Sequence, residues 1–323
     1  MTVLAHPLVD VIIVGGGPAG LAAALGVCRA ARAAIVFDSG HYRNEGVSHF
    51  HTFPGRDHTD PSELRADARR EIETRYPGAV IFIQGEVVEA KKVEDGSFEL
   101  RDAVGRLFKG RKLVLATGSR DILPSIPGYV DCWPGQIYQC LFCDGIEHKS
   151  TATAAGVLCL SPDSFSHVPF NALTAKRFVP AVTVFTNGSI SHNDPRLAPL
   201  LRKGLAVDHR LVARIEKLAA DAQGGLRLHF VNGPPVDLAF LVHKPPTELS
   251  RASAHLASQL GLELTPGGEI ALSNAFQQTS VEGVFAAGDC ADPTKQVVRA
   301  VAQGVTAAGG LHKALVDEEL AAA

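Results

Sequence analysis

Short apolar runs alternate with glycine turns and apolar helices along this chain. Residues 9–14 form a β-branched run that predicts a buried strand, an Ala- and Leu-rich helix is expected over 19–31, and 34–37 predict the next strand. That second strand ends at Asp38. Strand, glycine turn, helix and strand in this order make a βαβ unit of ordinary size. The pattern therefore predicts an α/β fold.

Two further blocks carry the same kinds of pattern. The first block predicts a helix over 62–75, capped by Ser62. A small antiparallel insert of strands at 80–84, 86–94, 97–102 and 105–109 follows, and then a buried strand at 112–118. The second block predicts strands at 155–160, 182–185 and 238–242, helices at 165–176 and 195–203, and a hairpin that pairs 211–218 with 226–231. Linkers are expected at 124–134 and 243–246, and a long last helix over 296–316. We therefore predict a first domain of residues 1–122 and 244–323, interrupted by a second domain at 123–243.

The composition narrows the function. The 323 residues are 46% hydrophobic and 20% charged, which suits a soluble α/β protein with room for two domains. The net charge of −3, without a dense basic run, predicts neither nucleic acid nor an anionic membrane as a partner. Apolar stretches are too short for a bilayer span and residues 1–10 lack a secretory pattern, so we expect a cytosolic protein.

A glycine-rich turn, Gly15–Gly20, joins the first strand to the first helix. In such a turn Gly15 permits the tight bend, Gly17 lets the backbone approach a pyrophosphate, and Gly20 allows the helix to pack closely on the strand. The helix N-terminus then faces the phosphates, and Asp38, 18 positions after Gly20, is placed to accept hydrogen bonds from a ribose. Because strand, loop, helix, strand and acid come in order, the pattern predicts a dinucleotide site.

A second strand-to-helix turn ends in Gly288–Asp289. A carboxylate at this place suits a polyol such as the ribityl chain of a flavin. The alternative is that Asp289 is the N-cap of the final helix. Together with the glycine-rich turn, the flavin interpretation is favoured.

A Cys-x-x-Cys pair, Cys140 and Cys143, has the spacing of a redox-active disulfide. We expect it at the start of a helix, whose dipole would lower the pKa of one thiol. No metal site is predicted, because structural zinc needs four ligands and the chain has no second such pair and no His-x₃-His; an inert pair is the other alternative. Asp144 is the candidate general acid/base for the thiol proton, or else an acid in a surface turn beside Gly145.

Three histidines, His49, His51 and His148, are secondary candidates for proton transfer, although partly exposed loop histidines are commoner. Cys28 and Cys159 fit buried apolar patterns and are expected to be inert.

The inserted domain lacks a second glycine-rich turn. Where a flavoprotein with two nucleotide sites would carry it, this chain has residues 157–164, in which Leu160 and Pro162 remove flexibility and one N–H. After the next strand, residues 186–192 hold no cation, and Arg196 is the first that follows. One dinucleotide site and one dithiol predict a flavoenzyme that takes its electrons from thiols.

Over nearly its whole length the chain resembles the low-molecular-weight thioredoxin reductase family. The resemblance is carried by the glycine-rich turn, by residues 140–145, and by the stretches 53–55, 116–118, 279–289 and 296–297. It implies two Rossmann-like domains: a discontinuous FAD domain and an inserted, degenerate NADPH-type domain that carries the Cys-x-x-Cys. It also implies a homodimer in which Cys143 faces the flavin, Cys140 meets the partner thiol and Asp144 supplies the proton.

FAD is the cofactor that the resemblance implies. The residues expected to hold it come from the glycine-rich turn, the end of the second strand, the Ala-Thr-Gly stretch and the final turn and helix: Gly15, Gly17, Pro18, Ala19, Gly20, Asp38, Ser39, Thr117, Gly118, Gly288, Asp289, Gln296 and Val297.

The altered inserted domain is similar to that of the gliotoxin-oxidase branch, the FAD-dependent dithiol oxidases of fungal secondary metabolism. The loop 42–44, which leads to residues 49–51, resembles that branch as well. These enzymes close a disulfide across a small dithiol diketopiperazine and pass electrons to O₂. We therefore predict a dithiol oxidase whose partners are a small-molecule dithiol, O₂ and a second copy of the chain. A thioredoxin-disulfide reductase fed by NADPH or another donor, a dithiol-dependent rearrangement enzyme and a flavin-binding redox sensor stay open.

Overall fold

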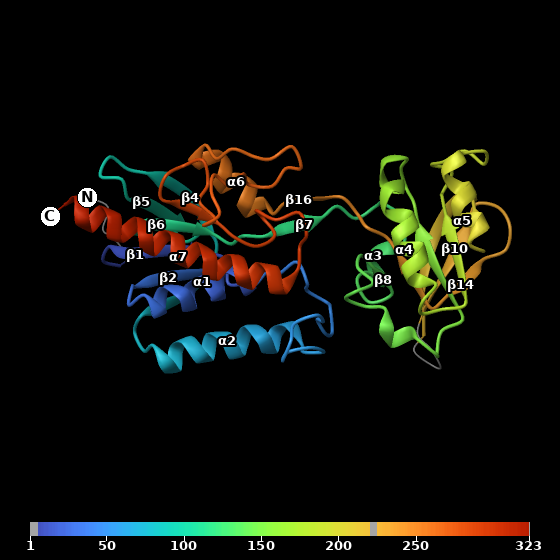
Figure 1. Cartoon of the computed structure of the whole chain (residues 1–323), viewed down its shortest axis with the longest axis horizontal. Helices are drawn as coiled ribbons and strands as arrows, with labels where there is room; N and C mark the ends of the chain where they lie inside the picture. Colours follow the sequence, from blue (N-terminus) through green and yellow to red (C-terminus); the bar gives the residue numbers. More distant parts are fainter. Residues whose placement is uncertain (1–5, 220–224, 323) are drawn as a thin grey trace. The chain divides into compact units, whose positions relative to one another are not determined.

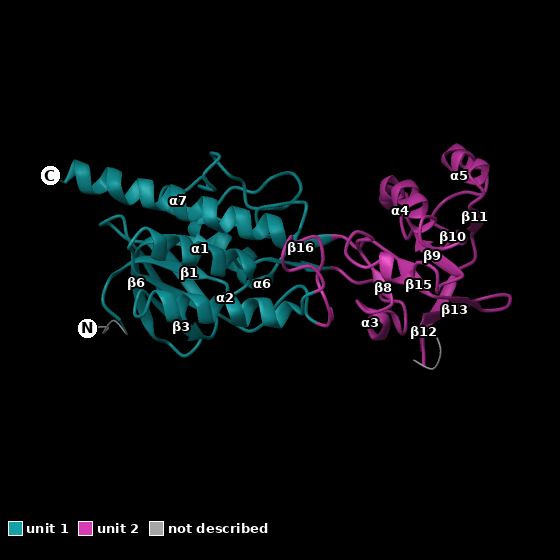
Figure 2. Ribbon diagram, turned by 60° about the horizontal axis from the view of Figure 1, so that its bottom comes forward, with its two compact units in different colours: residues 1–45, 59–121, 247–323 teal, residues 46–58, 122–246 magenta. Residues whose placement is uncertain are grey.

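The computed structural model describes residues 6–219 and 225–322, and the chain divides into two compact units (Figures 1 and 2). Unit 1 comprises Met1–Glu45, Thr59–Asp121 and Thr247–Ala323, and unit 2 comprises Gly46–His58 and Ile122–Pro246. The ends of the predicted first domain, residues 1–5 and 323, lie outside the described residues. Within the described part of the chain, no helix has the length and apolar character that a membrane span requires.

Unit 1 is built on a seven-stranded sheet of order β3-β2-β1-β6-β5-β4, with β17 also paired to β6. The pairs β3-β2, β2-β1, β1-β6 and β6-β17 are parallel, whereas β5 and β4 extend the sheet antiparallel. These strands are β1 (Val9–Val14), β2 (Ala34–Asp38), β3 (Val80–Gln84), β4 (Val87–Lys92), β5 (Phe98–Asp102), β6 (Leu107–Leu115) and β17 (Val284–Ala286). A separate short ladder pairs β7 (Ser119–Asp121) with β16 (Thr247–Leu249).

Helices and loops cover both faces of this sheet. Its helices are α1 (Pro18–Arg29), α2 (Pro61–Arg75), α6 (Arg251–Leu260) and α7 (Val297–Ala321). Alternate residues of β1 divide between two cores, with Ile13 in the core that α1 and α7 share and Ile12 in the core that includes α6. The long helix α7 lies along α1 (Figure 1), at a spacing that only glycine permits: a Cβ on Gly304 would lie 2.1 Å from the Ala19 carbonyl oxygen.

Unit 2 has a parallel five-stranded sheet of order β11-β10-β9-β15-β8 and an antiparallel three-stranded sheet β12-β13-β14. The strands are β8 (Ile137–Tyr138), β9 (Ala154–Leu158), β10 (Ala181–Phe185), β11 (Ala206–Asp208), β12 (Val212–Leu218), β13 (Gly225–Phe230), β14 (Val236–Leu238) and β15 (Phe240–Val242). The helices are α3 (Tyr129–Cys132), α4 (Val168–Ala175) and α5 (Ala198–Arg202), with 3₁₀ turns η1 (Ile146–His148), η2 (Asp163–His167) and η3 (Pro195–Leu197). With Rossmann-like parallel sheets in both units, the predicted α/β fold class is confirmed.

Several predicted elements differ from the observed ones. The two strands expected at 105–109 and 112–118 are one strand, β6, because Gly110 is extended and packs against Ile12 instead of turning. Asp60, and not Ser62, caps α2: its carboxylate accepts a hydrogen bond from the Ser62 amide. The strand expected at 238–242 is broken at Ala239, since β14 pairs with β13 and β15 pairs with β9.

The compact units also differ from the predicted domain boundaries. The predicted first domain includes residues 46–58, but the structure groups this segment with unit 2. Two contacts within unit 2 account for the difference: Gly46 packs against Pro134, and His51 lies 3.5 Å from the Glu147 carboxylate. The chain therefore enters unit 2 twice.

Candidate functional site

The glycine-rich turn lies between β1 and α1 in unit 1. A Cβ on Gly20 would lie 1.8 Å from the Gly15 carbonyl oxygen, and one on Gly15 would lie 2.2 Å from the Ala116 carbonyl oxygen. Packing alone therefore requires both glycines. Gly17 is different, because nothing lies within 4 Å of the position its Cβ would take. It is the N-cap of α1 without a side-chain cap, and Pro18 follows as the first helical residue, so the helix N-terminus faces open space that suits an anion.

Asp38 ends β2 beside this turn. Its carboxylate occupies the space where a Cβ on Gly16 would lie, 2.2 Å from the Asp38 Cγ. It accepts hydrogen bonds from the Gly40 amide at 2.9 Å and from the Tyr42 hydroxyl at 2.7 Å. Burial and the neighbouring carboxylate raise the pKa of Tyr42 to about 12, so the phenol stays a donor. Ser39 follows Asp38, and its Oγ accepts from the His41 amide at 3.4 Å.

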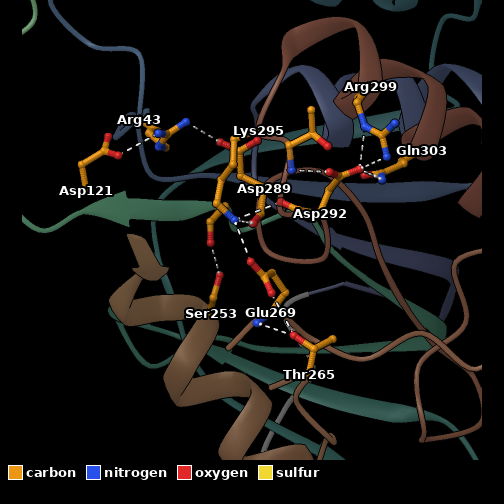
Figure 3. Close-up of polar contacts among 12 residues, drawn as sticks. Arg43, Asp121, Ser253, Thr265, Glu269, Asp289, Asp292, Lys295, Arg299 and Gln303 are labelled. Carbon is orange, nitrogen blue, oxygen red and sulfur yellow. Dashed lines mark hydrogen bonds and ion pairs between the residues drawn. The ribbon is translucent and has the colours of Figure 1, made fainter. Parts of the chain in front are cut away.

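Asp289 lies at the second turn of unit 1, where Arg43 joins it to Asp121 (Figure 3). The Arg43 guanidinium is 2.7 Å from Asp121 Oδ1 and 3.3 Å from Asp289 Oδ2. Burial raises the pKa of Asp289, and Arg43 and Lys295 oppose that rise. No role for Arg43 itself was predicted from the sequence, in which it is noted only as part of the loop 42–44.

The final helix does not use Asp289 as its cap. Helix α7 begins at Val297 with Gln296 in the N-cap position, so the alternative interpretation of Asp289 is wrong. The turn is held instead by Gln303, whose Oε1 accepts from the Gly288 amide at 2.8 Å. Its Nε2 donates to Asp292 at 2.5 Å (Figure 3). Asp289 is thus left to face the Arg43 cation.

Thr117 and Gly118, which follow β6, lie next to the start of α6. The Ser250 hydroxyl donates to the Thr117 carbonyl at 2.8 Å, and the Ser253 hydroxyl donates to the Gly118 carbonyl at 2.7 Å. Gly118 has φ +70°, a conformation that favours glycine. The predicted cofactor residues of unit 1 therefore lie on the glycine-rich turn, on the ends or flanks of β2, β6 and β17, and at the start of α7.

Cys140 and Cys143 form a disulfide in unit 2, with their Cα atoms 5.3 Å apart. The expectation of a helix start here is wrong. The pair forms a single turn closed by the Asp144 amide on the Cys140 carbonyl at 3.2 Å, and the 3₁₀ turn η1 begins only at Ile146. Gly145 ends the turn with φ −144°, in a space where a Cβ would lie 2.7 Å from the Phe178 ring. A helix dipole is therefore not what would activate either thiol.

Titratable groups gather beside the disulfide. Burial raises the pKa of Asp144 to about 6, with Glu147 raising it further and His51 opposing the shift. The Tyr138 hydroxyl is 3.0 Å from His148 Nε2, and burial lowers the pKa of His148, so this ring is a neutral partner near pH 7. Asp144 is consequently an acid whose charge changes near pH 6.

An apolar surface flanks the same turn. Phe142, between the two cysteines, is 63% exposed, and Phe170 on α4 is 58% exposed. Their rings are parallel, with centroids 6.3 Å apart, which is an offset stack. Ile146 is exposed as well. The sequence analysis missed this aromatic pair, because residues 142 and 170 come from different elements.

The other two histidine candidates lie in the segment 46–58 of unit 2. His51 is near Glu147 and Asp57, while the His49 ring stacks on that of His58 with centroids 4.0 Å apart. They thus belong to the unit that carries the disulfide.

The four remaining cysteines, Cys28, Cys132, Cys159 and Cys290, are free and buried. Burial raises the pKa of the Cys28 and Cys132 thiols, and it raises that of Cys290 to about 11.

Comparison with known proteins places the chain. Residues 9–156 and 250–304 match the family described as pyridine nucleotide-disulphide oxidoreductase. The chain belongs to this family. A protein named thioredoxin reductase sirT from Leptosphaeria maculans is 38% identical over 97% of this chain and 96% of its own length. Thioredoxin reductase aclD from Aspergillus oryzae is 40% identical over 98% of this chain and 100% of its own length.

Solved structures agree. A structure described as HlmI is 31% identical, covers 100% of this chain and 97% of its own, and has a TM-score of 0.87. An oxidoreductase from Agrobacterium tumefaciens is 32% identical over 95% of this chain and 98% of its own, with a TM-score of 0.82. The predicted resemblance to thioredoxin reductase-like proteins, closest to the gliotoxin-oxidase branch, is confirmed. Members of the pyridine nucleotide-disulphide oxidoreductase family are typically flavin-dependent.

The first segment that matches this oxidoreductase family ends at residue 156, just before the altered loop 157–164, and the match resumes at residue 250. In that loop two serines bond each other: the Ser161 amide donates to Ser164 Oγ, and the Ser164 amide donates to Ser161 Oγ, both at 3.2 Å. Ser164 Oγ also donates to the Ser161 carbonyl at 2.8 Å. The loop's own side chains therefore occupy two of the amides that would otherwise face a pyrophosphate.

A cation that contacts this loop, Arg196, already has partners of its own. Arg196 is paired with Asp194 at 2.8 Å and donates to the Pro162 carbonyl at 3.2 Å. Its guanidinium lies over the Phe165 ring, 4.7 Å from the centroid.

Proposed function

We propose that this protein is an FAD-dependent dithiol oxidase that closes a disulfide within a small-molecule dithiol of the epidithiodiketopiperazine kind. In the thiol-exchange step the substrate dithiol and the Cys140–Cys143 disulfide become a substrate disulfide and two cysteine thiols. Two electrons and two protons pass from substrate to protein in this step. The oxidised protein is regenerated when those electrons leave the cysteine pair for O₂, which becomes hydrogen peroxide.

The residues of unit 1 fit FAD. The open space at Gly17 and the uncapped start of α1 suit the pyrophosphate, and Asp38 lies beside that turn where a ribose would be bound. Asp289, held by Arg43, suits the polyol chain. When bound, FAD supplies a two-electron acceptor for thiols and a donor to O₂.

The turn of unit 2 suits a small apolar substrate. One substrate thiolate attacks the Cys140 sulfur, Cys143 leaves as a thiolate, and the second substrate thiol then displaces Cys140. The exposed rings of Phe142 and Phe170 offer flat apolar surface next to these sulfurs, to which a compact ring system could bind. Asp144 accepts a thiol proton in its ionised form, which is the major form above about pH 6.

The observation that carries the proposal is the state of the loop 157–164. Ser161 and Ser164 satisfy each other's amides, and Arg196 is engaged by Asp194. A nucleotide phosphate would have to break these bonds before it gained any of its own. This supports an enzyme that receives electrons through sulfur and not from a nicotinamide.

The second candidate is a thioredoxin-disulfide reductase. Its support is the name thioredoxin reductase that sirT and aclD carry, at 38% and 40% identity. Under this alternative, electrons pass through the same disulfide in the opposite direction. They come from NADPH or another donor and reduce a disulfide of a partner protein.

Oxygen uptake decides between the two. The purified flavoprotein is mixed with a panel of small dithiols and, separately, with reduced thioredoxin, while peroxide is measured. Uptake with small dithiols supports the proposal, and uptake with thioredoxin alone contradicts it. In a parallel anaerobic experiment, rapid bleaching of the yellow flavin by NADPH would favour the reductase.

A homodimer belongs to the same proposal, because the family resemblance implies one. Sedimentation of the flavin-loaded protein at micromolar concentration tests it, with a monomer as the contrary result.

A further inference from the structure

Three metal-ligating side chains from two distant segments of unit 2 meet at one place. His51, His58 and Glu147 each offer one ligand atom, and these atoms all lie within 4.8 Å of one another. His51 Nε2 is already 3.5 Å from Glu147 Oε1. Two imidazoles and one carboxylate form a donor set that binds zinc in metalloenzymes.

The segment 46–58 holds its two imidazoles in place through its backbone. Phe50, next to His51, is buried, and its carbonyl accepts the His58 amide at 3.1 Å. His58 has φ +60°, a left-handed backbone conformation that residues other than glycine rarely adopt. The His49 ring stacks on the His58 ring, with centroids 4.0 Å apart. The segment thus presents His51 and His58 together.

A second carboxylate orients His51. Asp57 Oδ1 accepts the Thr52 amide at 2.7 Å, and its Oδ2 lies 3.6 Å from His51 Nδ1. With Nδ1 directed at Asp57, Nε2 is the atom that faces Glu147. Metal-binding histidines commonly have this arrangement, in which a carboxylate on one ring nitrogen fixes the other nitrogen for the metal.

We propose that His51, His58 and Glu147 bind a divalent cation of the zinc class, with Asp57 as the positioning residue. Tetrahedral ligands about 2.0–2.2 Å from zinc lie roughly 3.3 Å apart. The His51 and Glu147 ligand atoms are already near this separation. The His58 ligand atom, within 4.8 Å of both, needs a side-chain adjustment of about 1.5 Å at most. Three protein ligands leave a fourth position for water. Such a metal would join the segment 46–58 to the turn that follows the disulfide.

This inference goes beyond the dithiol oxidation proposed above. The sequence predicted no metal site because it lacks a local ligand motif, whereas here residues 51 and 58 meet residue 147 only in the fold. The ligands do not include Cys140 and Cys143, which are joined in the disulfide. The site is therefore expected in the oxidised protein.

The test uses the metal alone on the oxidised, flavin-loaded protein. Co²⁺ is titrated and its visible spectrum recorded, and zinc affinity is then measured by competition with a chromophoric chelator. We expect one tetrahedral Co²⁺ per chain, without a sulfur-to-metal charge-transfer band. His58→Ala and Glu147→Gln should lose the spectrum, and Asp57→Asn should weaken zinc binding about tenfold or more.

The matched control is His192→Ala. His192 belongs to another close histidine pair of unit 2, with His209 at a centroid distance of 3.8 Å, and it should not change binding. Because the side chains of Asp57 and Glu147 are exposed, replacing them should not prevent folding. Circular dichroism checks the fold of every variant. The proposal is overturned if no saturable binding occurs, if binding survives His58→Ala and Glu147→Gln, or if it requires reduced cysteines.

Discussion

The loops at 15–20 and 157–164 hold comparable positions in their respective units, since each lies at the end of a strand of a parallel sheet, β1 or β9, and leads into a helical segment. In unit 1 the glycines are packed so closely that no side chain fits at Gly15 or Gly20, while Gly17 borders open space. In unit 2 the loop carries Ser161 and Ser164, whose hydroxyls occupy its own amides. Under the function proposed above, the difference teaches that a loop can be made unsuited to a nucleotide in two ways at once: it lacks the flexible residues, and its donors have internal partners.

The largest expected effect comes from the sulfur side of this comparison. Cys143→Ser leaves Cys140 able to form at most a mixed disulfide, so dithiol-dependent flavin reduction should fall by about a thousandfold or more. Stopped-flow absorbance of the flavin measures it. If NADPH still reduced the flavin rapidly in this variant, the loop at 157–164 would be functional and the comparison would fail.

Replacement of the acid beside the disulfide should have the next largest effect. The Asp144 carboxyl is protonated below its pKa of about 6 and ionised above it, so a base role makes kcat/KM for the dithiol rise with pH through about 6. Asp144→Asn should remove that rise and lower the rate by about a hundredfold. A pH profile of both proteins is the measurement. A variant that keeps the inflection would assign it to another group.

Gly17→Ala separates cofactor binding from folding in the first loop. Its added methyl meets no protein atom within 4 Å, so thermal stability of the flavin-free protein should be unchanged. The methyl would instead face the pyrophosphate, and we expect FAD affinity to fall about tenfold, or about 1.4 kcal/mol. Fluorescence titration with FAD measures this. The matched variant Gly20→Ala should lose stability as well, and equal FAD affinity in Gly17→Ala and the parent protein would contradict the assignment.

The smallest effect tests the serine pair of the second loop. Ser164→Ala leaves the Ser161 amide without its hydroxyl acceptor and should lower the free energy of unfolding by about 1 kcal/mol. Denaturant unfolding measures it, with Ser166→Ala, whose hydroxyl donates only to the Asp163 carbonyl at 3.2 Å, as the control. Equal losses in the two variants would mean that the serine pair has no special role.

Much of unit 1 could be predicted from local sequence patterns, because a βαβ unit is formed by residues that are neighbours in the chain. The strand β1, the turn at Gly15–Gly20 and the place of Asp38 all came from that pattern. Gly110 was mistaken for a turn, since a glycine needed for close packing and one needed for a turn are the same letter. The helix expected at Cys140 failed because Gly145 leaves the helical conformation and packs against Phe178, a contact invisible in the sequence.

The surroundings of the disulfide depended on tertiary structure. Glu147 and His51 are 96 positions apart in the chain but 3.5 Å apart in space, and no spacing rule connects them. The pairing of Phe142 with Phe170 had the same origin. The serine pair differs, because Ser161 and Ser164 are only three positions apart in the chain. Their hydroxyls could bind a ligand or could bond each other's amides. Only the structure shows that they bond each other's amides.

If the protein is the dithiol oxidase proposed above, the burial of its four unpaired cysteines has a consequence for turnover. A substrate thiolate or its cyclic disulfide could form a mixed disulfide with any accessible thiol, and each such event would inactivate one molecule. Cys28, Cys132, Cys159 and Cys290 are all buried, so reagent and product can reach sulfur only at the turn where exchange is reversible. The fold thereby limits self-poisoning during turnover.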